Sequence, residues 1–193
     1  MRLALFGGTF DPIHQAHLEI AGRAADRFHL DRILFVPAAR PPHKAGVTHA
    51  SYEHRVRMIE IACQGNPRLA LSRLEEGTER SYSIDTIEKV RAEMAPAGEL
   101  FFLIGADAFA EIRTWRRWRD VAAAVRFLVV SRPGHVYETP PEVRLERLDN
   151  LELPVSSSHI RQALATGGRP AEVPPRVLDY IVEHALYGAR VPA

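Results

Sequence analysis

The first residues of the chain constrain its fold more than any other stretch. A short apolar run, Arg2 to Phe6, is typical of a buried strand, and the pair Gly7-Gly8 ends it. Because glycine carries no side chain, the backbone at this point is open to close approach by another group. Thr9 and Asp11 are residue types that begin helices, and Pro12 fits a first helical turn. We therefore expect a strand, a glycine turn and a helix N-terminus in immediate succession.

Two histidines follow this turn. His14 and His17 are three residues apart, so on a helix their side chains lie on the same face. Free backbone N–H groups and the positive end of the helix dipole favour an anion at such a point, most often phosphate. Two imidazoles one turn apart could instead share a metal ion, although no third ligand with suitable spacing is evident. A histidine pair also occurs at surfaces and caps, and the spacing alone leaves these uses open.

Short apolar runs alternate with helical patterns along the rest of the chain. The further expected strands are Arg32 to Val36, Leu69 to Leu74, Leu100 to Ile104, Arg126 to Val130 and Leu151 to Val155. This alternation predicts an α/β fold with a doubly wound, mostly parallel, Rossmann-like sheet and helices on both faces. Pro133 to Asn150 is polar, prolyl and acidic, so we expect a surface excursion there. No internal repeat or boundary is evident, which favours one domain over residues 1–193.

Three of the further expected helices begin at serine residues. They are one capped by Ser51 with Val56, Ile59 and Cys63 buried, one capped by Ser83, and one from Ser156 to about Ala165. A helical stretch that includes Trp115 and Trp118 and a helix from Arg176 to about Tyr187 are also expected. In doubly wound sheets, ligands bind at the carboxyl ends of the strands. The segments that begin at Gly7, Pro41, Gly105 and Ser156 each follow a predicted strand, so we expect them to meet at one site.

Composition restricts the function classes. A formal net charge of +1 gives no case for nucleic-acid binding. The single cysteine, Cys63, excludes an internal disulfide and a multi-cysteine zinc site, and its apolar neighbours favour core packing. No apolar run approaches the length of a membrane span, and Met1-Arg2 leads directly into a core strand rather than a signal peptide. We expect a cytoplasmic enzyme or binding domain without a nucleic-acid or membrane partner.

The segment from Gly7 to His17 resembles the G-G-[TS]-F-D-P-x-H-x-G-H signature of the nucleotidyltransferase superfamily, with Ala16 in place of the usual glycine. It matches neither the G-x-G-x-x-G fingerprint of dinucleotide-binding folds nor the P-loop. The resemblance implies an ATP site. It assigns Gly7, Gly8, Thr9 and Phe10 to ATP, and His14 and His17 to its phosphates. The extra methyl group of Ala16 could crowd the approach of phosphate.

A second constellation lies near the other end of the chain, at Ser156 to Arg161. Hydroxyls at a helix N-terminus satisfy free N–H groups and can bind phosphate, and Arg161 one turn later offers a fork of donors. An ordinary N-cap followed by a surface arginine explains the same residues. The segment also resembles the second superfamily signature, I-S-S-T-x-I-R, with Val155 and Ser158 as conservative departures. That resemblance assigns Ser157 and Ser158 to ATP and Arg161 to the catalytic donors.

Three further segments resemble parts of the same superfamily. Pro41-Pro42-His43-Lys44 is similar to its P-P-H-K loop, where Lys44 would meet the phosphate of substrate or ATP. The pair Gly105 and Asp107 resembles its G-x-D segment at the adenosine ribose, and Arg132-Pro133-Gly134 its R-P-G loop beside adenine. Taken alone, these segments are a prolyl loop with a solvated lysine, a helix start capped by Asp107, and a turn.

Substrate-side residues indicate one branch of the superfamily. Ser81 to Thr86 and Thr114-Trp115 resemble the bacterial nicotinate-nucleotide adenylyltransferases. In that family the Trp stacks on the pyridine ring, while backbone N–H groups and a hydroxyl bind its carboxylate, and an aromatic face suits a flat ring. The resemblance places Tyr82, Ser83 and Trp115 at the substrate. The alternative for Trp115 is packing in the core.

The reaction that the resemblance implies transfers the adenylyl group of ATP to nicotinate mononucleotide and yields deamido-NAD and pyrophosphate. His14, His17, Lys44 and Arg161 are the expected donors, with Mg²⁺ on the triphosphate and no metal held by the protein. Three alternatives stay open: another enzyme of this fold such as phosphopantetheine adenylyltransferase, a nucleotide sensor, and a metal-dependent hydrolase that uses the two histidines. The oligomeric state, the kinetic order and the strictness for nicotinate over nicotinamide are open as well.

Overall fold

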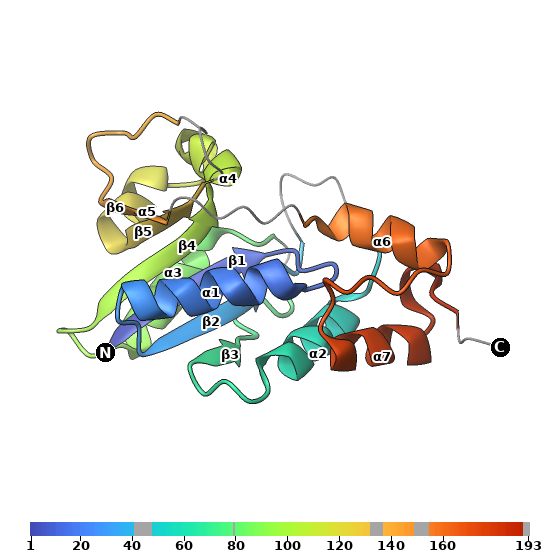
Figure 1. Ribbon diagram of the computed structural model, residues 1–193. Helices are drawn as coiled ribbons and strands as arrows, with labels where there is room; N and C mark the ends of the chain where they lie inside the picture. The colour runs from blue at the N-terminus through green and yellow to red at the C-terminus, as the bar shows by residue number, and fades with distance from the viewer. Residues whose placement is uncertain (41–47, 79, 132–136, 149–154, 191–193) are drawn as a thin grey trace.

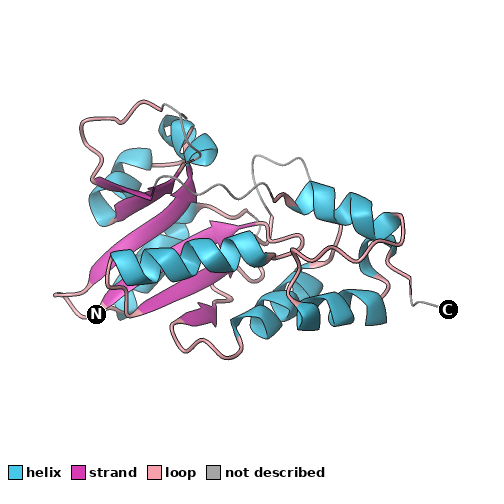
Figure 2. Cartoon of the chain, viewed as in Figure 1, coloured by secondary structure: helices cyan, strands magenta, loops and turns pink. Residues whose placement is uncertain are grey.

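A sheet of six strands with helices on both faces organises the chain (Figure 1 and Figure 2). The computed structural model describes residues 1–40, 48–78, 80–131, 137–148 and 155–190. The strands are β1 (Arg2–Gly8), β2 (Arg32–Pro37), β3 (Leu69–Leu71), β4 (Glu99–Gly105), β5 (Arg126–Val130) and β6 (Leu145–Leu148). They pair in parallel in the order β3-β2-β1-β4-β5-β6, which confirms the expected Rossmann-like α/β fold.

The helices alternate with the strands along the chain. They are α1 (Gln15–Arg27), α2 (Tyr52–Cys63), α3 (Ser83–Glu93), α4 (Ala106–Ala110), α5 (Trp118–Ala124), α6 (Ser157–Ala165) and α7 (Pro175–Glu183). Two 3₁₀ turns, η1 (Ile112–Thr114) and η2 (Leu186–Gly188), follow α4 and α7. Strand order changes direction between the central neighbours β1 and β4, so their carboxyl ends form the switch point where such folds bind ligands.

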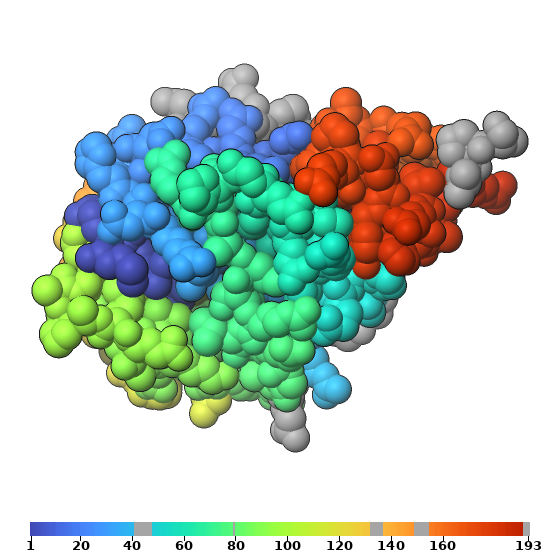
Figure 3. Space-filling model, turned by 90° about the horizontal axis from the view of Figure 1, so that it is seen from below, coloured from blue at the N-terminus to red at the C-terminus, as the bar shows by residue number. Residues whose placement is uncertain are grey.

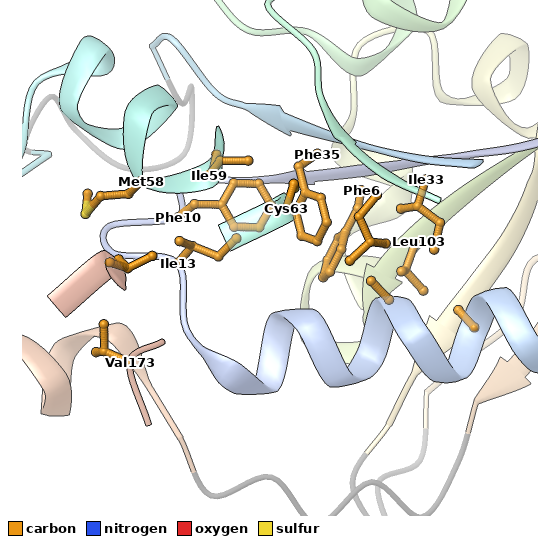
Figure 4. Packing of buried hydrophobic residues seen from close by; sticks show 14 of the residues in the cluster. Phe6, Phe10, Ile13, Ile33, Phe35, Met58, Ile59, Cys63, Leu103 and Val173 are labelled. Atoms are coloured by element: carbon orange, nitrogen blue, oxygen red, sulfur yellow. The ribbon is translucent and has the colours of Figure 1, made fainter. Parts of the chain in front are cut away.

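The side chains of β1 alternate between two hydrophobic clusters, one on each face of the sheet. Ala4 and Phe6 pack in the cluster that includes residues of α1, α2 and α7. Leu3 and Leu5 belong to the cluster that includes residues of α3 and α5. A strand buried on both faces reads as a continuous apolar run, which is why β1 was recognisable. Figure 4 shows Phe6 and Phe35 in the layer between the strands and α1.

The sixth strand is not where the sequence pattern predicted it. Leu145–Leu148 pairs in parallel with β5, although this stretch was expected to belong to a surface excursion. Only Leu148 is buried, while Glu146 and Arg147 are exposed, because an edge strand needs to cover little of the core. The prediction was wrong because two charged residues hide the alternation. Of the expected strand Leu151 to Val155, residues 151–154 lie outside the described ranges, and Val155 is not in a strand.

Several element boundaries also differ from the predictions. The stretch around the tryptophans is divided into α4, η1 and α5, and Trp115 lies between the last two. Strand β3 ends at Leu71, and the last helix ends at Glu183, before η2. The N-cap of α3 is Tyr82, one residue earlier than expected, whereas Ser51 and Ser156 cap α2 and α6 through their Oγ atoms as expected.

The C-terminal helices pack against α2, far away in sequence. Met58 and Ile59 of α2 share a buried cluster with Val177 and Ile181 of α7, and Figure 3 shows the red atoms of the C-terminal part beside the cyan and teal atoms of α2. Cys63 at the end of α2 is buried, and burial raises its pKa to about 12, in agreement with core packing. Within the described ranges no helix combines the length and the apolar character that crossing a membrane requires.

Candidate active site

The turn between β1 and α1 is longer than the sequence pattern predicted. Helix α1 begins at Gln15 with His14 as its N-cap, so Thr9, Asp11 and Pro12 do not begin it. The carboxylate of Asp11 accepts the backbone N–H groups of His49 at 2.7 Å and Ala50 at 3.1 Å instead of capping α1. The first N–H of the helix, at Gln15, donates to the carbonyl oxygen of Glu172 at 2.7 Å. The local preference of these residues for a helix start was therefore overridden by hydrogen bonds to residues far away in sequence.

Packing of Phe10 explains the glycine at position 8. Phe10 has a left-handed backbone with φ of 49°, and its ring is 3% exposed. The ring makes edge contacts with Phe6 and with His17, at centroid distances of 5.6 and 5.0 Å. A Cβ atom on Gly8 would approach the Phe10 ring to 2.8 Å, so a larger residue would displace it. Since the Phe10 ring is in the core (Figure 4), the ring does not line a surface that a ligand could reach.

The two histidines are brought together as a stacked pair. Their ring centroids are 3.8 Å apart at an interplanar angle of 26°, and His14 is 5% exposed. The backbone N–H of His14 donates to Nδ1 of His17 at 3.3 Å, which leaves the proton of the neutral His17 ring on Nε2. Burial lowers the pKa of His14 to about 4, partly offset by Glu172, and burial together with His14 lowers the pKa of His17 well below its ordinary value. At neutral pH both rings are uncharged hydrogen-bond donors.

The N-terminus of α6 docks on the turn before the histidines. Ser157 Oγ donates to the carbonyl oxygen of Pro12 at 3.0 Å. Arg161 donates through Nη1 to the carbonyl oxygen of Asp11 at 2.7 Å and through Nη2 to Ser158 Oγ at 3.2 Å. The two signature segments, from opposite ends of the chain, are therefore in direct contact. The methyl group of Ala16 is buried in the protein, with the residue 4% exposed.

Three polar residues that interact at this turn, Asp11, Arg55 and Tyr187, were not predicted as site residues. Arg55 is fully buried and donates through Nη1 to the carbonyl oxygen of Thr9 at 2.8 Å. Burial lowers its pKa, and the field of Asp11 opposes that change. Tyr187 donates its hydroxyl to Asp11 Oδ1 at 2.7 Å. For Arg55, the signal in the sequence was its position next to Val56 on the apolar face of α2, where a charged side chain requires a partner.

A cleft of about 520 Å³ opens at the carboxyl ends of the central strands. Its size is that of a typical small-molecule site. It brings together the predicted residues Gly7, Gly8, Thr9, Tyr82, Ser83 and Trp115. Trp115 packs edge-on against Phe102 at a centroid distance of 5.7 Å and still lines the cleft. The glycine turn and the aromatic pair are therefore walls of one space.

Among the residues that the structure describes, two charged ones line this cleft, and neither was predicted. Glu75 is 8% exposed, Thr86 donates its hydroxyl to Glu75 Oε1 at 3.0 Å, and burial raises the pKa of Glu75. The guanidinium of Arg116 lies 4.8 Å from the centroid of the Tyr82 ring, and its Nη1 is 3.5 Å from Asp85 Oδ2. Among the described residues that line the cleft, Arg116 is the cation. In the sequence, only the neighbouring Trp115 indicated that Arg116 could belong to the site.

The other predicted residues fall into three groups. His14, His17, Ser157, Ser158 and Arg161 surround the turn after β1 rather than line the cleft. Gly105 ends β4 and Asp107 lies in the first turn of α4, while their neighbours Ile104 and Ala108 line the cleft. Lys44 and Arg132, with the segments 41–44 and 132–134, lie outside the described residues.

The donor set suits a metal ion that arrives with phosphate. No group of three or more His, Cys, Asp or Glu side chains suited to a metal occurs in the parts of the chain that the structure describes. Mg²⁺ prefers oxygen ligands, keeps several waters and is usually held through substrate phosphates. The stacked imidazoles are nitrogen donors, which this ion disfavours. The described donors are therefore compatible with Mg²⁺ that is bound through triphosphate oxygens.

Comparison with known proteins gives consistent matches. The model of the cytidylyltransferase-like family matches residues 5–163. A "Probable nicotinate-nucleotide adenylyltransferase" of Solibacter usitatus is 68% identical over 97% of this chain and 100% of that protein, and one of Thermus thermophilus is 41% identical over 97% and 100%. The solved structure of Plasmodium falciparum nicotinic acid mononucleotide adenylyltransferase complexed with NaAD has the same fold, with a TM-score of 0.79, 20% identity and 99% coverage of both chains.

Proposed function

This chain belongs to the cytidylyltransferase-like family as a nicotinate-nucleotide adenylyltransferase, and on that premise we propose which of its residues carry the reaction. The enzyme transfers the adenylyl group of ATP to nicotinate mononucleotide and forms deamido-NAD and pyrophosphate. The observation that carries the residue assignment is the cleft that joins the glycine turn to Tyr82, Ser83 and Trp115. With ATP bound at the turn and the pyridine ring bound at the aromatic wall, the 5′-phosphate of the mononucleotide would meet the α-phosphorus of ATP between them.

The nucleophile needs no activation by the protein. An oxygen of the 5′-phosphate of the mononucleotide forms a bond to the α-phosphorus of ATP, the bond from that phosphorus to the bridging oxygen breaks, and its electron pair leaves with pyrophosphate. A phosphate monoester has a second pKa near ~6 and is mostly a dianion at neutral pH, so no general base is required. The task of the protein is alignment and stabilisation of charge on the phosphoryl oxygens.

The phosphate side is assigned to the turn after β1 and to α6. We propose that backbone groups of Gly7, Gly8, Thr9 and Phe10 meet ATP, and that His14 and His17 donate to phosphate oxygens as neutral rings. Arg161 supplies a formal charge one turn into α6, beside Ser157 and Ser158. Lys44 is proposed as a further cation, and Gly105, Asp107 and Arg132 are proposed for the adenosine moiety.

The Mg²⁺ expected with ATP would be held by triphosphate oxygens and water, where it offsets phosphate charge.

Because its substrate is ATP, we place the enzyme in the cytoplasm. We also propose that residues 1–193 act as one domain, since the residues of α6 and η2 complete the turn that follows β1.

The substrate side is assigned to the aromatic wall. We propose that the indole of Trp115 stacks on the pyridine ring and that Ser83, the first residue of α3, offers its hydroxyl to the carboxylate. The first N–H groups of a helix have no partner within it, so the N-terminus of α3 suits an anion. Arg116, stacked over Tyr82, adds positive charge at the same end of the cleft.

Pyrophosphate release tests this proposal against its rivals. The purified protein is supplied with Mg²⁺, ATP and one of three acceptors: nicotinate mononucleotide, nicotinamide mononucleotide or phosphopantetheine. Release should be fastest with nicotinate mononucleotide and should leave deamido-NAD as product. Fastest release with phosphopantetheine would assign another substrate to the same fold. ATP binding without release would indicate a sensor, and activity that follows tightly bound zinc would indicate the hydrolase.

A further inference from the structure

The carboxylate of Asp11 joins three segments that are far apart in sequence. Its Oδ2 accepts the N–H of His49 at 2.7 Å, and its Oδ1 accepts the N–H of Ala50 at 3.1 Å and the hydroxyl of Tyr187 at 2.7 Å. The residue is 4% exposed, so its charge depends on these donors. The imidazole Nδ1 of His49 is 3.5 Å from Oδ2 and adds a weaker contact. Asp11 therefore acts as a junction between segments.

Tyr187 is the donor that comes from farthest along the chain. It lies in η2 with φ of 56° and ψ of 21°, and Ala185 before it has φ of 49°. Left-handed backbone is unfavourable for residues that carry a Cβ atom, so surrounding contacts must hold this turn. Gly188 packs closely on the end of α6, where an added Cβ would lie 3.5 Å from Ala165 Cα. Burial, followed by the bond to Asp11, raises the pKa of Tyr187, so its hydroxyl stays protonated and donates.

The two histidines come shortly after Asp11, the residue whose carboxylate Tyr187 binds. The carbonyl oxygen of Asp11 accepts Arg161 Nη1 at 2.7 Å, so main chain and side chain of one residue are both fixed. His14 comes three residues later, is the N-cap of α1, and stacks on His17. Any displacement of Asp11 is therefore carried into the position of the two imidazoles.

We propose that Tyr187 is a positioning residue for the phosphate side of the site, because its hydroxyl holds Asp11 and thereby the turn that presents His14 and His17. The proposal rests on the assignment of the two histidines to the ATP phosphates. A misplacement of about 1 Å in a catalytic group can lower the rate a hundredfold. Loss of a single hydroxyl at Tyr187 should therefore have a measurable effect on a reaction in which that hydroxyl does not take part.

The test is Tyr187→Phe, which removes the hydroxyl and keeps the ring. We expect kcat/KM for ATP to fall about tenfold, because a bond to a carboxylate is among the stronger hydrogen bonds. The KM for nicotinate mononucleotide should change by less than about twofold, since Trp115 and Ser83 line the cleft and neither Tyr187 nor Asp11 does. A folding defect alone would lower the active fraction and leave both KM values unchanged.

Tyr180→Phe is the matched control. Tyr180 lies in α7, and its hydroxyl forms a hydrogen bond of 2.8 Å with His54 Nδ1, so the variant loses one hydroxyl bond away from Asp11. Both kinetic constants should stay within about twofold of wild type. In the Asp11→Ala background, which has no acceptor for the Tyr187 hydroxyl, Tyr187→Phe should cause little further loss, because the two substitutions remove the same contact.

The inference is overturned if Tyr187→Phe matches Tyr180→Phe in kcat and in both KM values, or if it changes only the melting temperature. It is also overturned if the effects of Tyr187→Phe and Asp11→Ala multiply as independent losses. Failure of the proposed function would look different: the wild-type protein itself would release no pyrophosphate with nicotinate mononucleotide.

Discussion

At the scale of single residues, the stacked histidines determine how this site can handle charge. Two protonated rings at a centroid distance of 3.8 Å would repel each other, and burial already disfavours a charge on either. The resting site therefore presents N–H donors, and Arg161 is the described cation that binds this turn. If the proposed phosphate contacts form, they would favour protonation of these rings, and nucleotide binding would then be coupled to proton uptake.

The first prediction concerns stability against pH. His14 takes up a proton near pH 6.5 in the unfolded chain but only near pH 4 in the folded protein. The contribution of His14 to the free energy of unfolding is therefore complete above pH 6.5. It is lost as pH falls from 6.5 to 4 and changes no further below pH 4. Over that range we expect wild type to lose about 2–3 kcal/mol more stability than His14→Gln, measured by urea unfolding.

His159→Gln is the control, because that residue is exposed at the start of α6. It should lose stability with falling pH in parallel with wild type. A His14→Gln profile parallel to wild type would mean that His14 is charged in the folded protein below pH 6.5.

At the scale of elements, α6 matters through what its first turn holds. Arg161 bridges the carbonyl oxygen of Asp11 and the hydroxyl of Ser158, so the guanidinium uses two of its nitrogen atoms on protein groups. The remaining donors of the fork can serve a phosphate oxygen without loss of these bonds. The helix therefore fixes both the turn and the charge beside it.

Arg161→Lys is predicted to lower kcat by about tenfold or more, because a point charge cannot form both bonds and still reach phosphate. Steady-state pyrophosphate release measures the effect. Arg169→Lys is the control, since Arg169 forms an exposed ion pair with Asp179 at 3.6 Å. Nearly full activity in Arg161→Lys would show that Arg161 provides only diffuse charge.

Elements were predictable where local pattern and tertiary packing agree. Strand β5 has the predicted bounds, and Ser51 and Ser156 cap the predicted helices. The start of α1 was wrong because Asp11 finds partners at positions 49, 50 and 187, which no local pattern reveals. Edge strand β6 was missed because an edge requires little apolar sequence.

At the scale of the whole molecule, the cleft combines an apolar body with a sparse set of charges. Glu75 is buried in the wall of the cleft and accepts a hydrogen bond from Thr86. Arg116 lines the cleft with its guanidinium over the ring of Tyr82. A substrate carboxylate would meet Arg116 as its nearest formal counter-charge among the described residues of this cleft. We therefore expect the choice between nicotinate and nicotinamide to depend on Arg116 as well as on α3.

Arg116→Gln is predicted to reduce the preference for nicotinate over nicotinamide mononucleotide by about tenfold in kcat/KM, since the amide loses less when the charge is removed. The KM for ATP should hardly change. Arg113→Gln is the control from the same segment, because Arg113 pairs with Glu138 at 3.0 Å and does not line the cleft. An unchanged preference in Arg116→Gln would assign selectivity to α3 alone.

The candidate site was predictable as a set of motifs rather than as an arrangement. The sequence pattern indicated Gly7, Tyr82, Ser83 and Trp115, and the fold places them around one cleft. It missed Arg116 and Arg55, because the value of a charged side chain depends on neighbours that only the tertiary structure supplies. Roles assigned by resemblance, such as those of Lys44 and Arg132, stay predictions.

The contacts of Asp11 also have a consequence for how the enzyme comes into being. Its bonds to Arg161 and Tyr187 span 150 and 176 residues, so they close some of the longest loops that this chain allows. A ribosome makes β1 long before η2. The nascent chain can build much of its sheet before Tyr187 is available to bind Asp11. We therefore expect a nascent chain to become active only after η2 has been made, which would keep it from consuming ATP through a half-built site.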